Sequence, residues 1–83
     1  MEMPEHITRR WIDSLSNGDL LEVESRLHST FVTLEGAEKA RRGDRYDLMR
    51  APADLLAAWD SWSRVSTEAR VRGLQARRAQ RDR

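Results

Sequence analysis

The sequence predicts a mainly α-helical fold, a small domain of two to three packed helices. Apolar residues recur three or four positions apart over two long segments, which is the period of an amphipathic helix. Glycine and proline stand near the ends of these segments, where helices stop and start. The chain of 83 residues suffices for one domain, and its three tryptophans and net charge of +1 argue against disorder. Cysteine is absent, which excludes disulfides and thiolate metal sites.

The first helix is expected at residues 4–16. Pro4 suits a first helical turn, where a missing backbone N–H is tolerated. Residues 16–19, Ser-Asn-Gly-Asp, predict a stop with a left-handed C-cap, after which Ser16 or Asp19 could cap the next helix. The apolar face of the first helix comprises Ile7, Trp11, Ile12 and Leu15.

The second helix is expected at residues 19–36, which carry the clearest apolar stripe in the chain. Gly36 lies where this helix could end, although residues 37–42 could also prolong it. The alternation of residues 45–49 after a Gly-Asp turn signal favours a short β-hairpin or loop near residues 38–49. The stripe consists of Leu20, Val23, Leu27, Phe31 and Leu34.

The third helix is expected near residues 52–80, with Pro52 at its first position. The chain then divides into a helical core domain at residues 1–65 and an arginine-rich C-terminal helix or tail at residues 66–83. Gly73 weakens the tail helix by about 1 kcal/mol relative to alanine. We expect the helices to pack through Leu20, Leu27, Phe31, Leu55, Leu56 and Trp59, with Trp62 and Val65 on the same face.

The C-terminal segment is strongly basic. The last twenty residues of the chain, 64–83, hold seven arginines against two acids. This suggests a nucleic-acid, anionic or acidic-protein partner, the alternative being a solubilising helix end. Trp59 and Trp62 are either core residues or, for one of them, the exposed anchor of an interface, where tryptophan is enriched. The candidate partner-binding residues are Arg70, Arg72, Arg77, Arg78, Arg81, Arg83 and Trp62.

No motif in the chain points to catalysis. His6 and His28 lack a second ligand at metal spacing, and Glu22 and Glu24 point to different helix faces. We therefore expect no enzyme activity, no cofactor and no metal. No apolar run is long enough to cross a membrane, and the acidic N-terminus lacks the apolar core of a signal peptide. Both observations favour a cytoplasmic protein without a membrane partner.

Residues 43–59, GDRYDLMRAPADLLAAW, resemble one stretch of the phage head–tail joining family known as gpW-like. Members of that family tend to show a helix, a Gly/Asp-Arg turn, a short strand, a leucine-rich helix and a basic tail. The match covers residues 20–65, and the chain differs in carrying a helix before Ser16 and no β-like segment at residues 38–42. The resemblance implies a structural adaptor that seats on the portal ring of a viral or virus-like head, which makes the virion a second expected location.

The sequence thus predicts a non-enzymatic assembly adaptor or interaction module that binds a larger protein assembly or further copies of itself. The resemblance narrows this function to head–tail joining in a phage or phage-like particle. The alternative is a small nucleic-acid-binding or regulatory protein, including an inhibitor or antitoxin, that uses its basic C-terminal tail.

Overall fold

The computed structural model describes residues 3–74, and all regular secondary structure in this part of the chain is helical. This confirms the predicted mainly α domain of packed helices. From the N-terminus the elements are α1 (Arg9–Ser14), α2 (Asn17–Arg42), the 3-10 turns η1 (Gly43–Arg45) and η2 (Leu48–Arg50), and α3 (Ala53–Val71).

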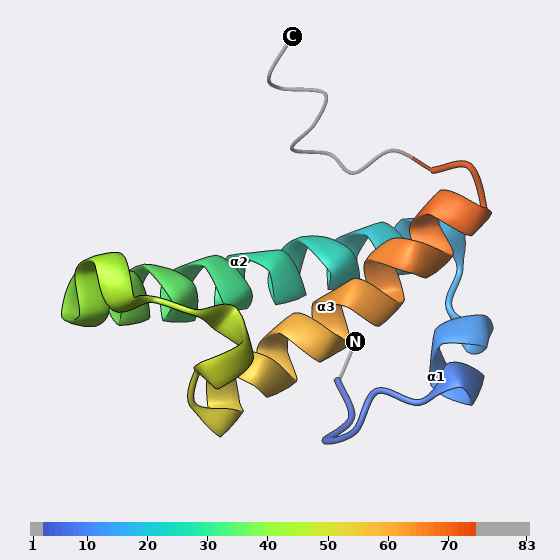
Figure 1. Cartoon of the computed structure of the whole chain (residues 1–83). Helices are drawn as coiled ribbons and strands as arrows, with labels where there is room; N and C mark the ends of the chain where they lie inside the picture. Colours follow the sequence, from blue (N-terminus) through green and yellow to red (C-terminus); the bar gives the residue numbers. More distant parts are fainter. Residues whose placement is uncertain (1–2, 75–83) are drawn as a thin grey trace, which may run out of the picture.

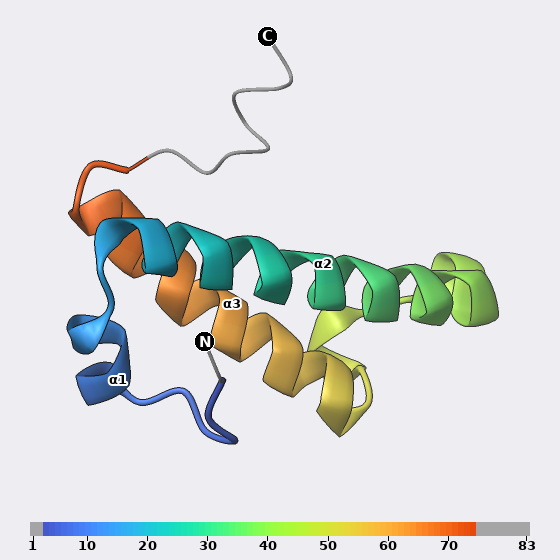
Figure 2. The same ribbon diagram turned by 180° about the vertical axis from the view of Figure 1, so that it is seen from behind.

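Two long helices form the body of the molecule (Figure 1). α2 and α3 pack side by side and run in opposite directions, and η1 and η2 join them at one end. The short α1 lies at the other end, where α2 begins and α3 ends, as the view from behind also shows (Figure 2). A short connection makes consecutive helices antiparallel neighbours, as in helical bundles.

α1 is shorter than predicted, because Thr8 caps it. The Thr8 hydroxyl accepts a hydrogen bond from the Trp11 backbone N–H at 3.1 Å, which satisfies one of the free donors of the first turn. The chain is extended again at Leu15, so the helix predicted at residues 4–16 covers only Arg9–Ser14.

The predicted left-handed C-cap at residues 16–19 is wrong. Ser16 is the N-cap of α2, and its hydroxyl accepts a hydrogen bond from the Asp19 N–H at 3.1 Å. An N-cap residue has an extended backbone, which Ser16 adopts at φ −67° and ψ 164°. Gly18 therefore lies in the first turn of α2 and not in a left-handed cap.

α2 continues through Gly36 to Arg42, which confirms the alternative that residues 37–42 prolong the helix. These six residues are alanine, glutamate, lysine and arginine, whose helix propensity outweighs the cost of about 1 kcal/mol for one glycine. Basic side chains in the last turn also favour the negative end of the helix dipole. The helix ends at Gly43, whose φ of 57° is readily adopted by glycine alone.

The predicted β-hairpin near residues 38–49 is wrong, since the described part of the chain contains no strand. The Asp47 side chain accepts a hydrogen bond from the Met49 N–H at 3.0 Å and begins the turn η2. Leu48 packs against the core and Met49 is exposed, so the alternating pattern reflects a capped turn. A strand here would also lack a partner, because residues 38–42 belong to α2.

α3 begins after its N-cap Pro52 and ends at Val71, so the helix predicted near residues 52–80 is shorter than expected within the described chain. Residues 75–80 of that prediction lie outside the described residues. Residues 66–71, which the sequence assigned to the C-terminal segment, continue α3 without a break.

The end of α3 is determined by Gly73, which has a left-handed φ of 75°. The Gly73 N–H donates to the Arg70 carbonyl at 3.0 Å, and the Leu74 N–H donates to the Ala69 carbonyl at 2.8 Å. These two bonds form a Schellman motif, and Leu74 packs against the core cluster that includes Ala69. Gly73 therefore does not lie inside a longer helix, as predicted; it forms the C-terminal cap of α3.

The core consists of two clusters of buried apolar side chains. The first cluster joins all three helices and contains Ile12, Leu15, Leu20, Val23, Leu27, Val65 and Ala69. The second cluster lies beside the connection between α2 and α3 and contains Phe31, Ala51 and Leu55. Of the residues predicted to pack the helices together, Leu20, Leu27, Phe31 and Leu55 are buried, Leu56 is half-buried and Trp59 is exposed.

Trp62 connects the two clusters, since it packs against both. Its ring stacks on Phe31 with a centroid distance of 5.5 Å and an angle of 13°, and it lies 5.1 Å from the ring of His28. Its indole N–H donates to Glu24 Oε2 at 2.7 Å. Glu24 is 1% exposed, so this bond supplies a donor to a carboxylate that water does not reach.

We expect Leu27→Ala to lower the free energy of unfolding by about 2–5 kcal/mol, as truncation of a buried leucine does. Leu27 is 9% exposed in the first cluster, whereas Val32 on the same helix is 47% exposed. Val32→Ala is the matched control and should change stability by less than about 0.5 kcal/mol. Urea denaturation followed by tryptophan fluorescence measures both, and equal midpoints for the two variants would contradict the helix pairing.

Two glycines should respond to alanine with opposite sign. Gly73→Ala should destabilise by about 1–2 kcal/mol, because an L-residue is strained at positive φ. Gly36→Ala should stabilise by about 0.5–1 kcal/mol, because Gly36 is helical and a Cβ there meets no atom within 4 Å. Thermal melting of the two variants tests this, and a stabilising Gly73→Ala would show that the Schellman motif does not form.

Candidate interaction surface

The exposed tryptophan of α3 is Trp59, whereas Trp62 belongs to the core. Trp59 is 37% exposed, and neither core cluster includes it. Ala58 packs against the second cluster, and the next residue is rotated by about 100° around the helix, which places Trp59 at the edge of the buried face. Leu55, Ala58 and Trp62 are spaced by three and four residues, which is the signal in the sequence that Trp62 and not Trp59 lies on the buried face.

Arg72, predicted to bind a partner, is engaged within the molecule. Its Nη1 donates to the Leu15 carbonyl at 2.8 Å and to Asn17 Oδ1 at 3.2 Å, and its Nη2 donates to the Ile12 carbonyl at 3.2 Å. The Ile12 carbonyl also accepts from the N–H of the C-cap Leu15 at 3.1 Å, and the guanidinium adds a charged donor to both carbonyls at the end of α1 across 57 or more residues of chain. Its positive charge also suits the C-terminal end of a helix.

Glu68 anchors the other side of Arg72. Its carboxylate is 8% exposed and accepts hydrogen bonds from Arg72 Nε at 2.8 Å and from Arg9 Nη2 at 2.7 Å. The hydrogen bond from Arg72 is the largest influence on Glu68 and, with that from Arg9, lowers its pKa against the opposing effect of burial. The three side chains thus join the end of α3 to both ends of α1.

Arg72→Met should destabilise the protein by about 1–3 kcal/mol, because it leaves the Ile12 and Leu15 carbonyls without their charged donor. Arg70→Met is the matched control, since Arg70 lies on the exposed face of the same helical turn and should change stability by less than about 0.5 kcal/mol. Denaturant midpoints compare the two. Equal midpoints would mean that the bonds to α1 do not hold the helices together.

The lowered pKa of Glu68 predicts an acid-sensitive contribution to stability. The ionised carboxylate is favoured in the folded state, so its contribution is present above its unfolded pKa of about 4.5 and is lost as the pH falls through the lower folded pKa. Glu68→Gln should therefore flatten the pH dependence of the melting temperature below about pH 4.5. Glu22→Gln, which changes a carboxylate that is 42% exposed, is the control. Below about pH 4.5 its melting temperature should fall more steeply with pH than that of Glu68→Gln.

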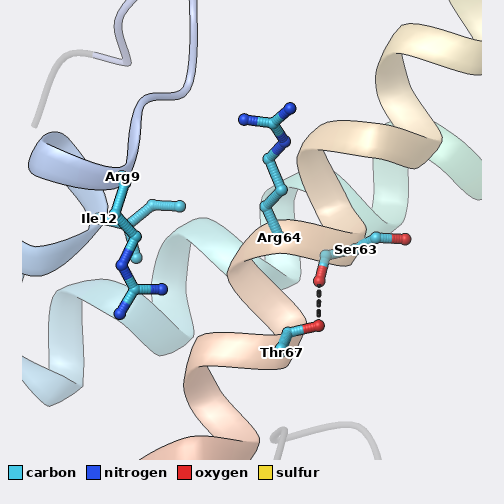
Figure 3. Close-up of a pocket in the computed structure, with 5 residues that line it drawn as sticks. All are labelled: Arg9, Ile12, Ser63, Arg64 and Thr67. Atoms are coloured by element: carbon cyan, nitrogen blue, oxygen red, sulfur yellow. Dashed lines mark hydrogen bonds between the residues drawn. The ribbon is translucent and has the colours of Figure 1, made fainter.

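A pocket of about 310 Å³ lies between α1 and α3 (Figure 3). The close-up shows the guanidinium groups of Arg9 and Arg64 pointing in different directions, while the Thr67 hydroxyl donates to the Ser63 carbonyl at 2.8 Å. Arg9 is paired with Asp13 and Glu68, and Arg64 is paired with Asp60. The side chains around this pocket therefore do not converge on one ligand atom. Its lining residues are Arg9, Ile12, Ser63, Arg64 and Thr67.

A second hollow of about 500 Å³ lies between residues 5–9 and the outer face of α3 and shares Arg9 and Arg64 with the first. Among residues 3–74, no three histidine or acidic side chains come together in a way that could hold a metal ion. Within the same residues, no helix is both long enough and apolar enough to cross a membrane.

The predicted basic site is only partly within the described chain. Arg70 lies exposed on the last turn of α3, and no hydrogen bond or ion pair joins its side chain to any residue from 3 to 74. The partner-binding role of Arg70 stays a prediction. The remaining four arginines of that site lie outside the described residues: Arg77, Arg78, Arg81 and Arg83.

The sequence did not indicate the surface at the connection between α2 and α3, called here the tip loop and comprising residues 43–50, which carries two arginines and two aspartates. Met49 is 76% exposed in this loop, more than any other large apolar side chain of the described residues. Arg45 and Arg50 lie exposed on either side of it in sequence. Asp47 caps the turn η2, so the segment predicted as a short strand is a turn instead.

Comparison of the chain with protein-family models, with curated proteins and with solved structures found no match in any of the three.

Proposed function

We propose that this chain is a non-enzymatic interaction module that docks on a larger protein assembly, with the exposed strip of α3 around Trp59 as its contact surface. The observation that carries the proposal is the exposure of Trp59. A chain with few large apolar residues leaves one tryptophan outside both core clusters, 37% exposed to solvent. Tryptophan is the residue type most enriched at interface hot spots, because it buries a large rigid surface at low cost in side-chain entropy.

The neighbours of Trp59 support the same surface. Leu56 lies three residues earlier on the same face of α3 and is half-buried, so part of its side chain extends the apolar strip. Asp60 and Arg64 pair at 3.0 Å beside the strip, where polar groups form the rim that interfaces require. An apolar centre with a polar rim is the arrangement found in protein–protein interfaces.

The resemblance of residues 43–59 to gpW-like proteins suggests the kind of assembly. Those residues contain the tip loop and the first part of α3, and the last of them is Trp59. We extend the proposal to an adaptor in a phage or phage-like particle that joins head to tail, located in the virion or in the cytoplasm where particles assemble. The extension is separate from the docking role, which rests on Trp59.

A second candidate function is binding to nucleic acid through the basic end of the chain. Arg70 favours it, because this exposed arginine of the arginine-rich segment is not paired with any acid of residues 3–74. Phosphate contacts of this kind are independent of sequence and weaken steeply with salt. A small regulatory protein, including an inhibitor or antitoxin, could use the same charges.

Photo-cross-linking tests the docking surface. A photoreactive phenylalanine analogue replaces Trp59 in one variant and Thr67, an exposed polar residue of the same helix, in the matched control. In cells that produce the full chain, position 59 should give a defined cross-linked species, either with a second copy or with another protein, that position 67 does not give. Equal patterns from the two positions would contradict docking through Trp59.

Trp59→Ala provides the energetic test on the purified chain. It should weaken self-association, or binding to the cross-linked protein, by about 2 kcal/mol, which is roughly thirtyfold, while stability changes by less than about 1 kcal/mol. Sedimentation velocity measures the association. A salt-sensitive shift on duplex DNA that Arg70→Gln weakens and Trp59→Ala leaves unchanged would favour the nucleic-acid function instead.

A further inference from the structure

Trp59 and Arg70 lie on the same side of α3. Their positions differ by about three turns of helix plus about 20° of rotation, and at about 1.5 Å per residue their backbones are about 16 Å apart along the axis. Glu68, which bonds to Arg9 of α1, is rotated by about 180° from Trp59 around the same helix. The side of α3 that carries Trp59 and Arg70 is therefore turned away from α1, and it is called here the outer face.

The fold of residues 3–74 uses neither side chain of this pair. Trp59 is 37% exposed and belongs to neither core cluster. Arg70 is exposed, and no hydrogen bond or ion pair joins its side chain to any residue of the described chain. Across about 16 Å of helix the indole of Trp59 and the guanidinium of Arg70 cannot reach each other within one chain. The outer face thus presents an aromatic ring and a cation that do not contact one another.

The outer face is low between these two residues. Ser63 and Ser66 lie within about 40° of Trp59 around the helix, and both are half-buried. The distance between two packed helices depends on the side chains at their crossing and ranges from about 8 Å to about 10 Å. Serine is small, so a second helix that crosses α3 at Ser63 and Ser66 can approach to the lower end of this range.

An indole ring and a guanidinium group attract each other. A cation over the face of tryptophan, within about 6 Å of the ring centre, interacts with the negative face of the ring, and the planar guanidinium also stacks on it. Tryptophan and arginine are both enriched at the centres of protein interfaces. A surface that supplied a cation at Trp59 and a ring at Arg70 would complement the outer face.

We infer that a second copy of this chain covers the outer face, with the two α3 helices antiparallel about a two-fold axis and Arg70 of each copy over Trp59 of the other. An axis midway between positions 59 and 70 brings these two positions opposite each other, and it brings Ser63 opposite Ser66 of the other copy. The inference rests on the proposed contact surface around Trp59 and names the partner that covers it.

The self-complementarity of the outer face favours a copy over an unrelated protein. A two-fold interface uses the same patch twice, so each residue must meet a suitable residue at the position that the axis exchanges with its own. The outer face meets this condition with a ring and a cation, and with two serines. Asp60 and Arg64 at its edge pair with each other at 3.0 Å, so they do not oppose the approach of a copy.

Sedimentation equilibrium of the full chain tests for the copy. The interface is one helix face, so the dimer should have about micromolar affinity, and the mean mass should rise between about 1 µM and about 1 mM. Trp59→Ala should weaken dimerisation about thirtyfold and Arg70→Gln at least about fivefold, since every dimer contains two of these contacts.

A mixture of the two variants identifies the contact itself. In the dimer of either variant alone, both ring–cation contacts are damaged. A mixed dimer of Trp59→Ala with Arg70→Gln keeps one contact whole, between the tryptophan of one chain and the arginine of the other, and both substitutions meet in the second contact. The mixed dimer should therefore be at least about threefold tighter than either homodimer, beyond the statistical preference for mixed pairs.

Energy transfer between two dyes measures the mixed dimer. The chain has no cysteine, so Ser29→Cys, at an exposed position of α2, carries one dye on each variant. Val71→Ala removes an apolar side chain that is 74% exposed one residue after Arg70, and Arg10→Gln removes the charge of an exposed arginine of α1. Neither control should change dimerisation. Circular dichroism confirms that each variant keeps its helical fold.

Three outcomes would overturn the inference: a chain that stays monomeric up to about 1 mM, a dimer that Trp59→Ala and Arg70→Gln weaken no more than the controls do, or a mixture that associates no better than its components. Cross-links from position 59 to a different protein, with a monomeric chain, would overturn the second copy and leave docking through Trp59 intact. A dimer without any cross-link specific to position 59 would contradict the docking surface itself.

Discussion

The packing of Trp62 between α2 and α3 is the contact on which the rest of the structure depends. The second core cluster has three buried members, too few to hold two helices in register alone. Trp62 joins it to the larger cluster and stacks on Phe31, while its N–H satisfies the buried carboxylate of Glu24. A shift of α3 along α2 by one turn would break this bond and leave Glu24 without that donor, so the contact favours one register over its neighbours.

Buried carboxylates also lie near both ends of the helix pair. Glu38 is held by Arg41 and Arg42 at the end of α2, and Glu68 is held by Arg9 and Arg72 at the end of α3. Each carboxylate is itself buried and keeps its charge because guanidinium groups donate to it. Such groups add little net stability compared with apolar side chains. The contacts of Glu68 and Arg72 join α3 to α1 and so favour one arrangement of these helices, whereas Glu38 and its two partners all belong to α2 and support the end of that helix.

Because charged groups and small residues occupy part of the contact between α2 and α3, large apolar side chains remain at the surface. The seam between α2 and α3 is filled by leucines, small residues, one tryptophan and charged groups, and Trp59 at its edge and Met49 beyond its end lie outside both core clusters. Both are held by rigid elements, Trp59 by α3 and Met49 by the capped turn η2. The proposed docking surface around Trp59 thus lies at the edge of the packed seam, outside both core clusters.

The sequence by itself determined the helical class, the stripe of α2 and the start of α3, because these depend on local periodicity and on end signals such as Ser16 and Pro52. It misplaced the ends of helices near Gly36 and Gly73, since a glycine signals an end only where the backbone adopts a positive φ, and that depends on the neighbouring contacts. Only the tertiary structure decided which tryptophan of α3 packs against the core clusters and which arginine bonds to another helix. Arg72 contacts α1 across more than fifty residues of chain, a relation that no local pattern contains.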